Sequence, residues 1–489
     1  MAQQLERLQT SFDAKSSNKF QVLPGQRTYV QQYSHVYNKR GAALRGALEA
    51  AARRAFPGVK LADRVVEAAE EKGGQRLVVL GTTFKDCSHR PDVIEGSRGL
   101  FEAPSNPPAS LAAPDDAVVL EDESGRLKLT GLDARTLVTG LPVAAVGVNK
   151  GTHFEVERLV GCGFRKPRQS PMETNSAKVL LVGGLAYAGA DRATELKAMA
   201  RFTLLTDWLG GQLSTDEEND ELTRRIARCF CVGDVVCLEP GAAQGKERTA
   251  RALNVTNGSA EEKHTVLAPV RAADVRLARL AALVPTACLP GARDPTSFAL
   301  PQQPLHPLLL PEANRYSTFT ALPNPCEADV GGRSFLAHAG QPVRDMLRSA
   351  TYELGAAERL LSDGGKCLER HVDGDHDDAF LACLEDTLWW RHAAPTAPDT
   401  LPSYPFRDGD PFVMDEPPDV LVSGDAPAFA TSLAANQAGE TCARLVCLPS
   451  FAETGVCAVL DLETLAVERL CFDDGTADDA PPGPPAASA

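Results

Sequence analysis

Five glycine-containing segments follow apolar, strand-like runs and are the places where this chain could carry chemistry. They read GGLAYAG (183–189), GDVVC (233–237), GARD (291–294), AHAG (337–340) and GDAP (424–427). Ligand-binding and catalytic groups of α/β sheets lie at the carboxyl ends of strands, where these segments fall. Several carboxylates and imidazoles must converge there to hold divalent metals. The candidates in these segments are Asp234, Asp294, His338 and Asp425.

The order and spacing of the five segments resemble the metal motifs of calcineurin-like phosphoesterases, which read roughly D-x-H, G-D-x-x-D, G-N-H-D/E, a lone His and G-H-x-H. Two metals in such a site polarise the phosphoryl oxygens and activate a bridging water. Most ligands are replaced here, and Arg293 adds positive charge where cations should sit. The resemblance therefore implies an inactive site with no catalytic residue, no metal and no cofactor. Its vestigial positions are Asp234, Ala292, Arg293, Asp294, His338, Asp425 and Pro427.

Two patterns precede these segments. Residues 27–55 carry apolar and tyrosine side chains at helical spacing and predict a long helix, and residues 61–71 predict a second. Between residues 75 and 164, short β-rich runs alternate with turn residues. About five short strands in this length favour a small barrel, for which an OB-fold is the natural candidate.

From residue 176 the pattern becomes that of a layered α/β domain, because apolar runs alternate with helical faces. The runs at 443–451, 455–464 and 466–472 are hairpin-like and predict a mixed sheet. We therefore expect an α/β plus β protein, with an N-terminal helix and an OB-fold barrel joined to a phosphoesterase-like α/β mixed-sheet sandwich that lacks its metal ligands. The expected divisions are a flexible 1–26, a helical 27–74, an OB-fold 75–175, the sandwich 176–472 and an acidic Pro-rich tail 473–489, with loop insertions at 103–114 and 362–378.

Charge and composition exclude several protein classes. The formal net charge is −15, so the chain is a poor stand-alone binder of nucleic acid, because phosphate neutralisation needs clustered Lys and Arg. We expect no membrane helix, since no run of about 18 apolar residues exists. The N-terminal residues lack the apolar stretch of a secretory signal. Thirteen cysteines in a chain this long are best interpreted as reduced thiols of a cytosolic or nuclear protein.

Four longer stretches carry a second resemblance: QQYSHVYNKR (31–40), DPTSFALPQQPLHPLLLP (294–311), APTAPDTLPSYPF (394–406) and SGDAPAFA (423–430). A barrel before an inactive phosphoesterase domain resembles the B subunits of replicative DNA polymerases. From about residue 29 to 472 the chain is similar to the small subunits of DNA polymerase delta. The resemblance implies a nuclear, non-catalytic scaffold for DNA replication and repair. Its partners would be the C-terminal domain of the catalytic subunit, the third subunit and, indirectly, the sliding clamp.

The Pro-rich strings should form rigid extended loops, because proline lacks the N–H that a strand ladder needs. They either brace the core or display Tyr404 and Phe406 to a partner, and the sequence leaves both open. Trp389 and Trp390 are expected in the core or at a domain seam. The group His371, Asp373, Asp375, His376 and Asp377 is expected to be a solvated loop rather than a metal site.

Two other functions remain open from the sequence. One is a metal-dependent phosphodiesterase or exonuclease with an atypical site. The other is single-strand binding by the barrel, which needs a basic groove with stacking aromatic residues. Phe84, Phe154 and Phe164 are the aromatic candidates, but the charges around them are mixed, and barrel core is the simpler interpretation.

Overall fold

The structure of the chain is a computed structural model. It describes residues 6–14, 19–23, 25, 27–30, 32–89, 110–164, 176–186, 192–213, 217–236, 238, 260–351, 366–376, 378–436 and 438–473, and for 260–266 the backbone alone. Three expected features lie outside these residues: most of the 103–114 insertion, Asp377, and the tail from residue 474.

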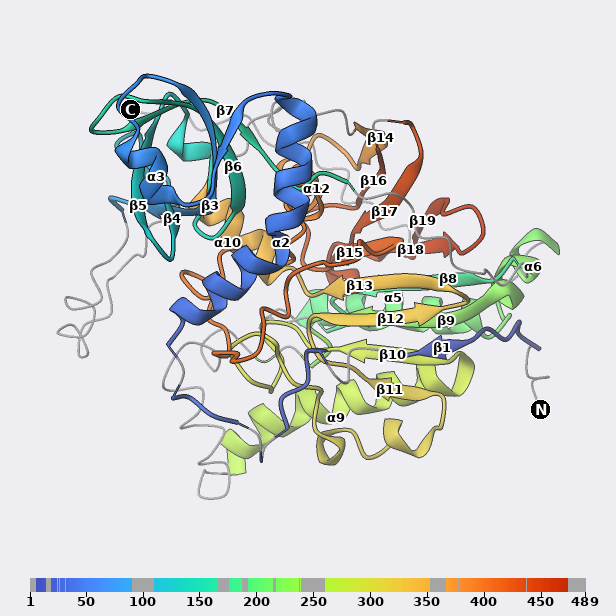
Figure 1. The fold of residues 1–489 in the computed structure, drawn as a ribbon. Coiled ribbons are helices and arrows are strands. Elements are labelled where there is room, and N and C mark those ends of the chain that lie inside the picture. Colours follow the sequence, from blue (N-terminus) through green and yellow to red (C-terminus); the bar gives the residue numbers. More distant parts are fainter. Residues whose placement is uncertain are drawn as a thin grey trace, which may run out of the picture.

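The expected five-stranded barrel is confirmed (Figure 1). The barrel closes because β3 pairs with both β4 and β6. Strands β5 and β7 lie between β4 and β6 and pair with each other in parallel. Core-facing and exposed residues alternate in β5, as a barrel wall requires. The bounds are β3 Arg76–Asp86, β4 Ala117–Asp122, β5 Gly125–Thr130, β6 Pro142–Asn149 and β7 Phe154–Val160, with the 3₁₀ turn η2 at Ala134–Thr136.

Helix α2 (Ser34–Ala55) packs Leu44 and Leu48 against the barrel. It begins seven residues later than the expected start at 27, because the preceding segment binds the Pro-rich chain at 403–404 instead of continuing a helix. The second helix is also shorter than expected. Residues Lys60–Ala62 form strand β2 beside β3, and only Val65–Glu70 form helix α3.

The α/β part contains two sheets packed face to face between helices. Phe230 and Phe335 stack across the interface of the sheets, with ring centroids 5.5 Å apart. The six-stranded sheet contains β8 Lys178–Gly183, β9 Ile226–Val232, β10 Thr286–Leu289, β11 Phe319–Ala321, β18 Val456–Asp461 and β19 Val467–Cys471. The seven-stranded sheet contains β1 Phe12–Asp13, β12 Cys326–Val330, β13 Arg333–His338, β14 Lys366–Val372, β15 Val420–Ser423, β16 Ala430–Ala435 and β17 Thr441–Cys447.

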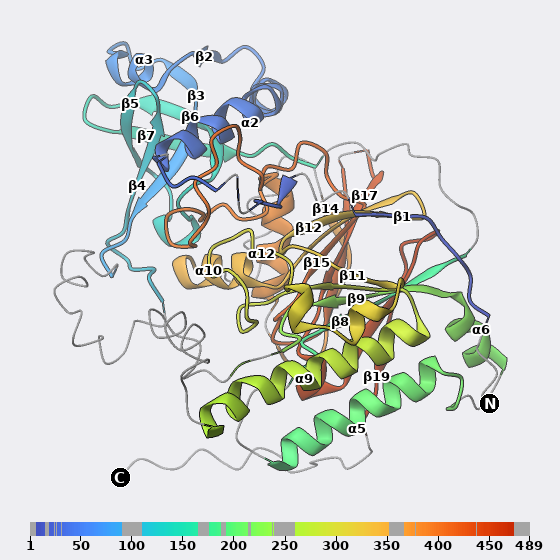
Figure 2. The same ribbon diagram turned by 90° about the horizontal axis from the view of Figure 1, so that it is seen from below.

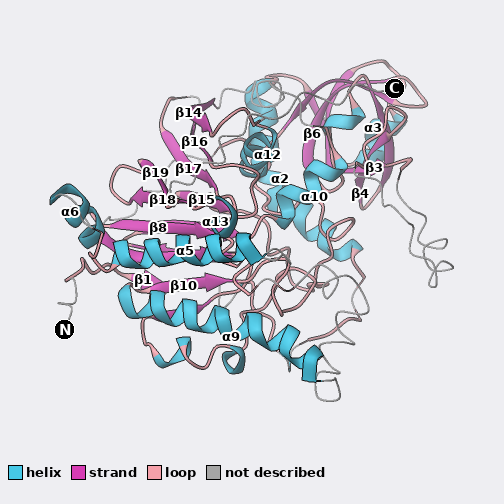
Figure 3. Cartoon of the chain, turned by 180° about the vertical axis from the view of Figure 1, so that it is seen from behind, coloured by secondary structure: helices cyan, strands magenta, loops and turns pink. Residues whose placement is uncertain are grey.

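Helices cover both outer faces of this sandwich (Figures 2 and 3). α5 and α9 pack on the six-stranded sheet, whereas α10 and α12 pack on the seven-stranded one. The described part of the chain holds no helix that is long and apolar enough to cross a membrane. The bounds are α5 Arg192–Leu209, α6 Glu217–Arg225, α9 Ala260–Leu283, α10 Gln341–Ser349, α12 Ala379–Trp389 and α13 Phe451–Thr454, with 3₁₀ turns η3 Pro307–Leu309 and η4 Ala313–Arg315.

The mixed sheets are confirmed, but the expected pairing of the last three runs is only partly right. β18 and β19 form a hairpin, whereas β17 joins the other sheet between β15 and β16. The insertion at 362–378 is expected to be a loop, yet it contributes β14 to the edge of the seven-stranded sheet. β14 pairs with a strand about 60 residues away, whereas β17 pairs with β15 and β16, the two strands that precede it.

Residues 6–14 lie within the segment that is expected to be loose. β1 instead pairs with β12. Arg7 donates through Nε to the carbonyl of Leu283 at 2.8 Å, and its other nitrogens donate to Leu209 and Thr223. These carbonyls lie at the ends of α9, α5 and α6, where backbone acceptors lack helical partners. Burial lowers the pKa of Arg7 to about 10, and a guanidinium with this pKa is still protonated at neutral pH.

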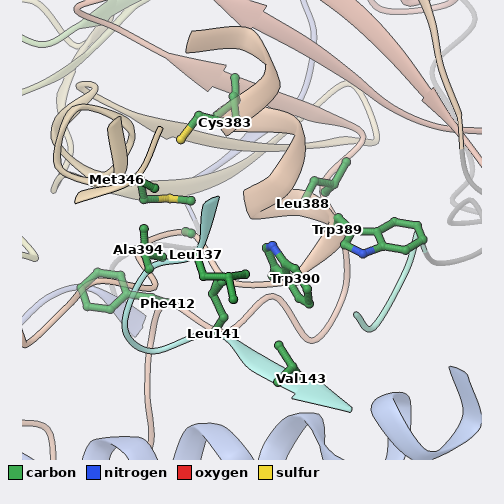
Figure 4. Packing of buried hydrophobic residues seen from close by; sticks show 14 of the residues in the cluster. Leu137, Leu141, Val143, Met346, Cys383, Leu388, Trp389, Trp390, Ala394 and Phe412 are labelled. Atoms are coloured by element: carbon green, nitrogen blue, oxygen red, sulfur yellow. The ribbon is translucent and has the colours of Figure 1, made fainter. Parts of the chain in front are cut away.

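One hydrophobic core joins the barrel to the sandwich, so the two parts form one body (Figure 4). Leu137, Leu141 and Val143 of the barrel side meet Trp390 and Met346 of the sandwich side in this core. The expectation that the tryptophan pair lies at a domain seam is confirmed.

A buried guanidinium holds the same seam together. Arg40 of α2 donates to Asp410 at 2.7 Å, to the Gly140 carbonyl of the barrel at 2.8 Å, and to Pro395 and Ala397 of the Pro-rich string at 2.7 and 2.6 Å. Burial opposes ionisation of Asp410, but Arg40 and His392 outweigh it and hold the pKa of this carboxyl far below its usual range. Arg40 therefore joins three separate stretches of chain through one side chain.

Replacing Arg40 by alanine should lower the free energy of unfolding by about 3–5 kcal/mol, because the Asp410 charge would stay buried without its partner. Urea unfolding of the full chain measures this loss. Lys39→Ala, an exposed change in the same helix, should stay within about 0.5 kcal/mol of the wild type. Equal effects of the two changes would contradict this role for Arg40.

Burial and the charge of Arg40 lower the pKa of His392 to about 4, whereas an unfolded histidine titrates near 6.5. Between pH 6.5 and pH 4 the unfolded state therefore binds a proton on His392 that the folded state does not bind. The free energy of unfolding consequently falls as the pH is lowered through this range. The contribution of His392 to the free energy of unfolding should fall by about 2 kcal/mol between pH 7 and pH 5. Urea unfolding of wild type and His392→Gln at both pH values isolates the contribution of His392, since other groups titrate alike in both proteins. A pH-independent difference between the proteins would contradict the prediction.

Candidate functional site

The carboxyl ends of strands from both sheets converge at one place, as the sequence pattern predicts. A Cβ atom on Gly233, after β9, would lie 2.5 Å from the Cβ of Ala339, after β13. One on Gly340 would lie 2.8 Å from the Cβ of Asp425, after β15. Gly233 is needed because the two sheets approach closely here, and Gly340 is needed because the ends of the neighbouring strands β13 and β15 do. Both also have positive φ angles, +75° and +93°, which glycine adopts without strain.

Asp234 lies at the centre of this junction, in a left-handed conformation with φ of +48°. Its carboxylate accepts from the Arg293 backbone N–H at 2.9 Å and from Arg293 Nε at 3.0 Å. A non-glycine residue at positive φ is costly and persists only where its surroundings hold it. The arginine that replaces a ligand in the sequence pattern therefore binds the carboxylate that remains.

Asp425 has the same backbone conformation and a comparable partner. Its φ is +53°, and Arg344 of helix α10 donates to its carboxylate at 3.1 Å and to its carbonyl at 2.7 Å. Burial raises the pKa of Asp425, and the nearby carboxylate of Asp234 raises it further, while Arg344 and Arg293 oppose the rise. Two acids and two guanidinium groups thus form one compensated cluster.

The other two predicted polar groups are committed to the backbone or buried. Asp294 accepts from the N–H groups of Val235, Val236 and Gly291 at 2.7–3.1 Å. His338 is fully buried, which lowers its pKa to about 4, and its Nδ1 accepts from the Gly340 N–H at 3.2 Å. Its Nε2 has no hydrogen-bond partner among the described residues. Both side chains therefore serve the loops that join the strand ends.

Of the seven predicted positions, Asp234 and Arg293 bind each other, and Asp425 lies close enough to both for their charges to shift its pKa. Asp294 and His338 bind backbone N–H groups of the adjoining loops. The other two, Ala292 and Pro427, are exposed beside them. Among the described residues, no group of three or more His, Cys, Asp or Glu side chains could hold a metal ion. His371 and Asp373 pair with each other at 3.1 Å, and Asp373 also binds Arg469.

Sequence reasoning missed three side chains that hold the site. Gln302 donates to the Gly291 carbonyl at 3.1 Å and accepts from Asn324 at 2.8 Å. Asn324 in turn accepts from the Ala339 N–H at 3.0 Å, which ties the two sheets together. Arg344 is the third. Arg344 could have been found from its position, four residues after the AHAG segment. Gln302 could have been found from its place inside the Pro-rich string.

Tyr404 and Phe406 belong to a second, separate feature. Their rings are 5.0 Å apart, and Tyr404 contacts Tyr29 at 5.6 Å and accepts from the Thr28 N–H through its hydroxyl. Both side chains are partly exposed, while Tyr29, Val30 and Tyr33 are 73%, 86% and 46% exposed. We call these five residues the aromatic surface. The aromatic residues therefore brace the N-terminal segment, and their display to a partner stays a prediction.

The barrel aromatics do not form a stacking platform. Phe154 is fully buried in the barrel core, as expected. Phe164 packs against Trp389 at 5.3 Å, at the seam. Phe84 is only half-buried, so the expectation of core is wrong for it, and Arg126 lies over its ring at 5.4 Å.

The sequence matches two family models and several known proteins. One model describes the B subunit of DNA polymerase alpha/epsilon and matches residues 180–431, and the other describes the OB-fold domain of the DNA polymerase delta subunit and matches residues 32–159. The DNA polymerase delta small subunit of Arabidopsis thaliana is 33% identical over 448 residues, which are 90% of this chain and 91% of that one. DNA polymerase delta subunit 2 of Drosophila melanogaster is 32% identical over 450 residues (91% and 94%), and the small subunit of Saccharomyces cerevisiae is 27% identical over 481 residues (94% and 92%). The chain therefore belongs to the B-subunit family of DNA polymerases and, within it, to the DNA polymerase delta small subunits.

Proposed function

We propose that this accessory subunit is a non-catalytic scaffold that binds the C-terminal domain of the polymerase delta catalytic subunit and the third subunit, supports processive DNA synthesis in the nucleus, and reaches the sliding clamp only indirectly. The observation that carries the proposal is the pairing of Asp234 with Arg293 and of Asp425 with Arg344. Positive charge is already supplied at the strand ends by protein side chains, so the acids there are stabilised without a cation.

The α/β part is, in this proposal, a phosphoesterase-like sandwich that has lost its metal centre. Two sheets between helix layers, with strand ends converging at Asp234 and Asp425, support this relationship. A two-metal centre does not fit the residues present, because Asp294 is used by three backbone N–H groups and both other acids bind arginines. We place the helical segment at 27–74, the OB-fold domain at 75–175 and the sandwich at 176–472.

The aromatic surface is the proposed docking site for another subunit. Aromatic side chains are enriched in the energetic centres of protein interfaces. Three of these five residues, Tyr29, Val30 and Tyr33, are exposed, and Tyr404 and Phe406 are partly exposed beside them. The Pro-rich backbone beneath them is held by hydrogen bonds between Leu300 and residues 402 and 404. A prearranged surface of this kind loses little conformational entropy on binding.

The rival function is a metal-dependent phosphodiesterase. Stoichiometric Mn²⁺ together with phosphodiesterase activity that Asp234→Ala abolishes would replace the scaffold proposal. We expect neither in the purified chain, because the acids described at the strand ends are already bound by arginines and backbone N–H groups.

Arg293→Ala, which removes this guanidinium, should lower the free energy of unfolding by about 1–2 kcal/mol. The loss is modest because Arg293 is partly exposed and solvent screens part of the interaction. Asp234→Asn in the same protein should recover part of this loss, because it removes the charge left behind. Urea unfolding of the two variants provides the measurement. Arg315→Ala, which removes an exposed pair with Glu312, is the control and should have little effect. No recovery by Asp234→Asn would count against charge compensation.

Co-expression with the C-terminal domain of the polymerase delta catalytic subunit should give a stoichiometric complex on size-exclusion chromatography. Tyr404→Ala combined with Tyr29→Ala should weaken this complex at least tenfold, since two contacting rings are lost from the aromatic surface. Tyr316→Ala, another partly exposed tyrosine, should leave it intact. Clean separation of two folded wild-type proteins would remove the main support for the scaffold function.

A further inference from the structure

A groove of about 670 Å³ lies between helix α2 and the barrel wall. We call it the α2–barrel groove. Its apolar floor includes Leu48, Leu80 and the half-buried ring of Phe84. None of the five residues of the aromatic surface lines it. It is therefore a second feature, which the proposed scaffold function does not use.

Small residues in α2 keep this groove open. Gly41 and Ala42 both line it, and a Cβ atom added to Gly41 would meet no heavy atom within 4 Å. A helix that packs on a barrel normally fills such positions with apolar side chains. Here the space beside Gly41 is left for atoms that the helix itself does not supply.

The charges around the groove are unequal. Its three arginines are already paired: Arg45 with Glu49 at 2.9 Å, Arg64 with Glu67 at 3.4 Å, and Arg126 with Glu121 at 2.7 Å. Three further carboxylates line it, those of Asp63, Asp122 and Glu123. Asp63 and Glu123 are exposed, whereas Asp122 accepts from the backbone at Val65 and Ser124. The wall of the groove is therefore acidic.

We propose that the α2–barrel groove binds a basic peptide segment of a partner protein, with a large apolar side chain in the space beside Gly41 and Lys or Arg residues against Asp63 and Glu123. An apolar anchor beside complementary charge is how grooves select peptide segments. The acidic wall disfavours a nucleic-acid backbone, which carries the same charge. This site goes beyond the scaffold function and does not depend on it.

Two synthetic 12-residue peptides test the site, one with two Leu, two Phe and four Lys, the other with four Glu in place of the Lys. Fluorescence anisotropy with the full chain at about 0.1 M salt, where long-range attraction is screened, gives their affinities. The Lys peptide should bind saturably, and the Glu peptide at least tenfold more weakly. Glu123→Lys should lower the affinity of the chain for the Lys peptide severalfold.

The decisive comparison uses three leucine substitutions that leave the charge unaltered. Gly41→Leu fills the groove and should lower the affinity for the Lys peptide at least tenfold. Ala42→Leu should have the same effect. Gly46→Leu lies in the same helix, outside the groove, also has open space around it, and should change nothing. Equal affinity of Gly41→Leu and Gly46→Leu for the Lys peptide, no saturable binding, or direct binding of labelled single-stranded oligo(dT) that Gly41→Leu weakens would each overturn the proposal. Urea midpoints of all three leucine variants verify that each is folded.

Discussion

The architecture depends on one buried cation. The Arg40 guanidinium reaches from helix α2 to the barrel at Gly140, to the Pro-rich string at Pro395 and Ala397, and to the carboxylate of Asp410. Burying a charge is unfavourable unless it is paired and its hydrogen-bonding capacity is used. Here four acceptors meet that condition, and each lies on chain that would otherwise be free to move. Gly140 is required at this point, because a Cβ atom there would lie 2.1 Å from the Pro395 carbonyl.

The same principle explains the strand-end junction. The sheets meet so closely at Gly233 and Gly424 that the acids beside them are partly removed from water. Such acids need compensating charge, and the arginines at 293 and 344 provide it. The internal ion pairs therefore stabilise the acids at this junction.

The Arg40 cluster and the shared core make the barrel and the sandwich one body, and the strand-end cluster lies within the sandwich, where its two sheets meet. The continuous core from Leu137 to Trp390 adds apolar burial to the polar links. Surfaces that are already ordered in this way lose little conformational entropy when another chain binds them. The aromatic surface and the α2–barrel groove both lie on segments that this body holds in place.

Sequence alone determined the types of most elements, since alternation in the barrel strands and helical spacing in α5 and α9 are local properties of the chain. It also located the strand ends and showed that Arg293 stands among them, because glycine and polar residues interrupt apolar runs there. Only the tertiary structure decided which sheet β17 joins, where helix α2 begins, that Arg344 reaches Asp425, and that Phe84 lines a groove. The last three depend on contacts between residues far apart in sequence, whereas β17 had to choose between the strands before and after it. Local patterns fix what an element is, but packing against distant chain selects its partners.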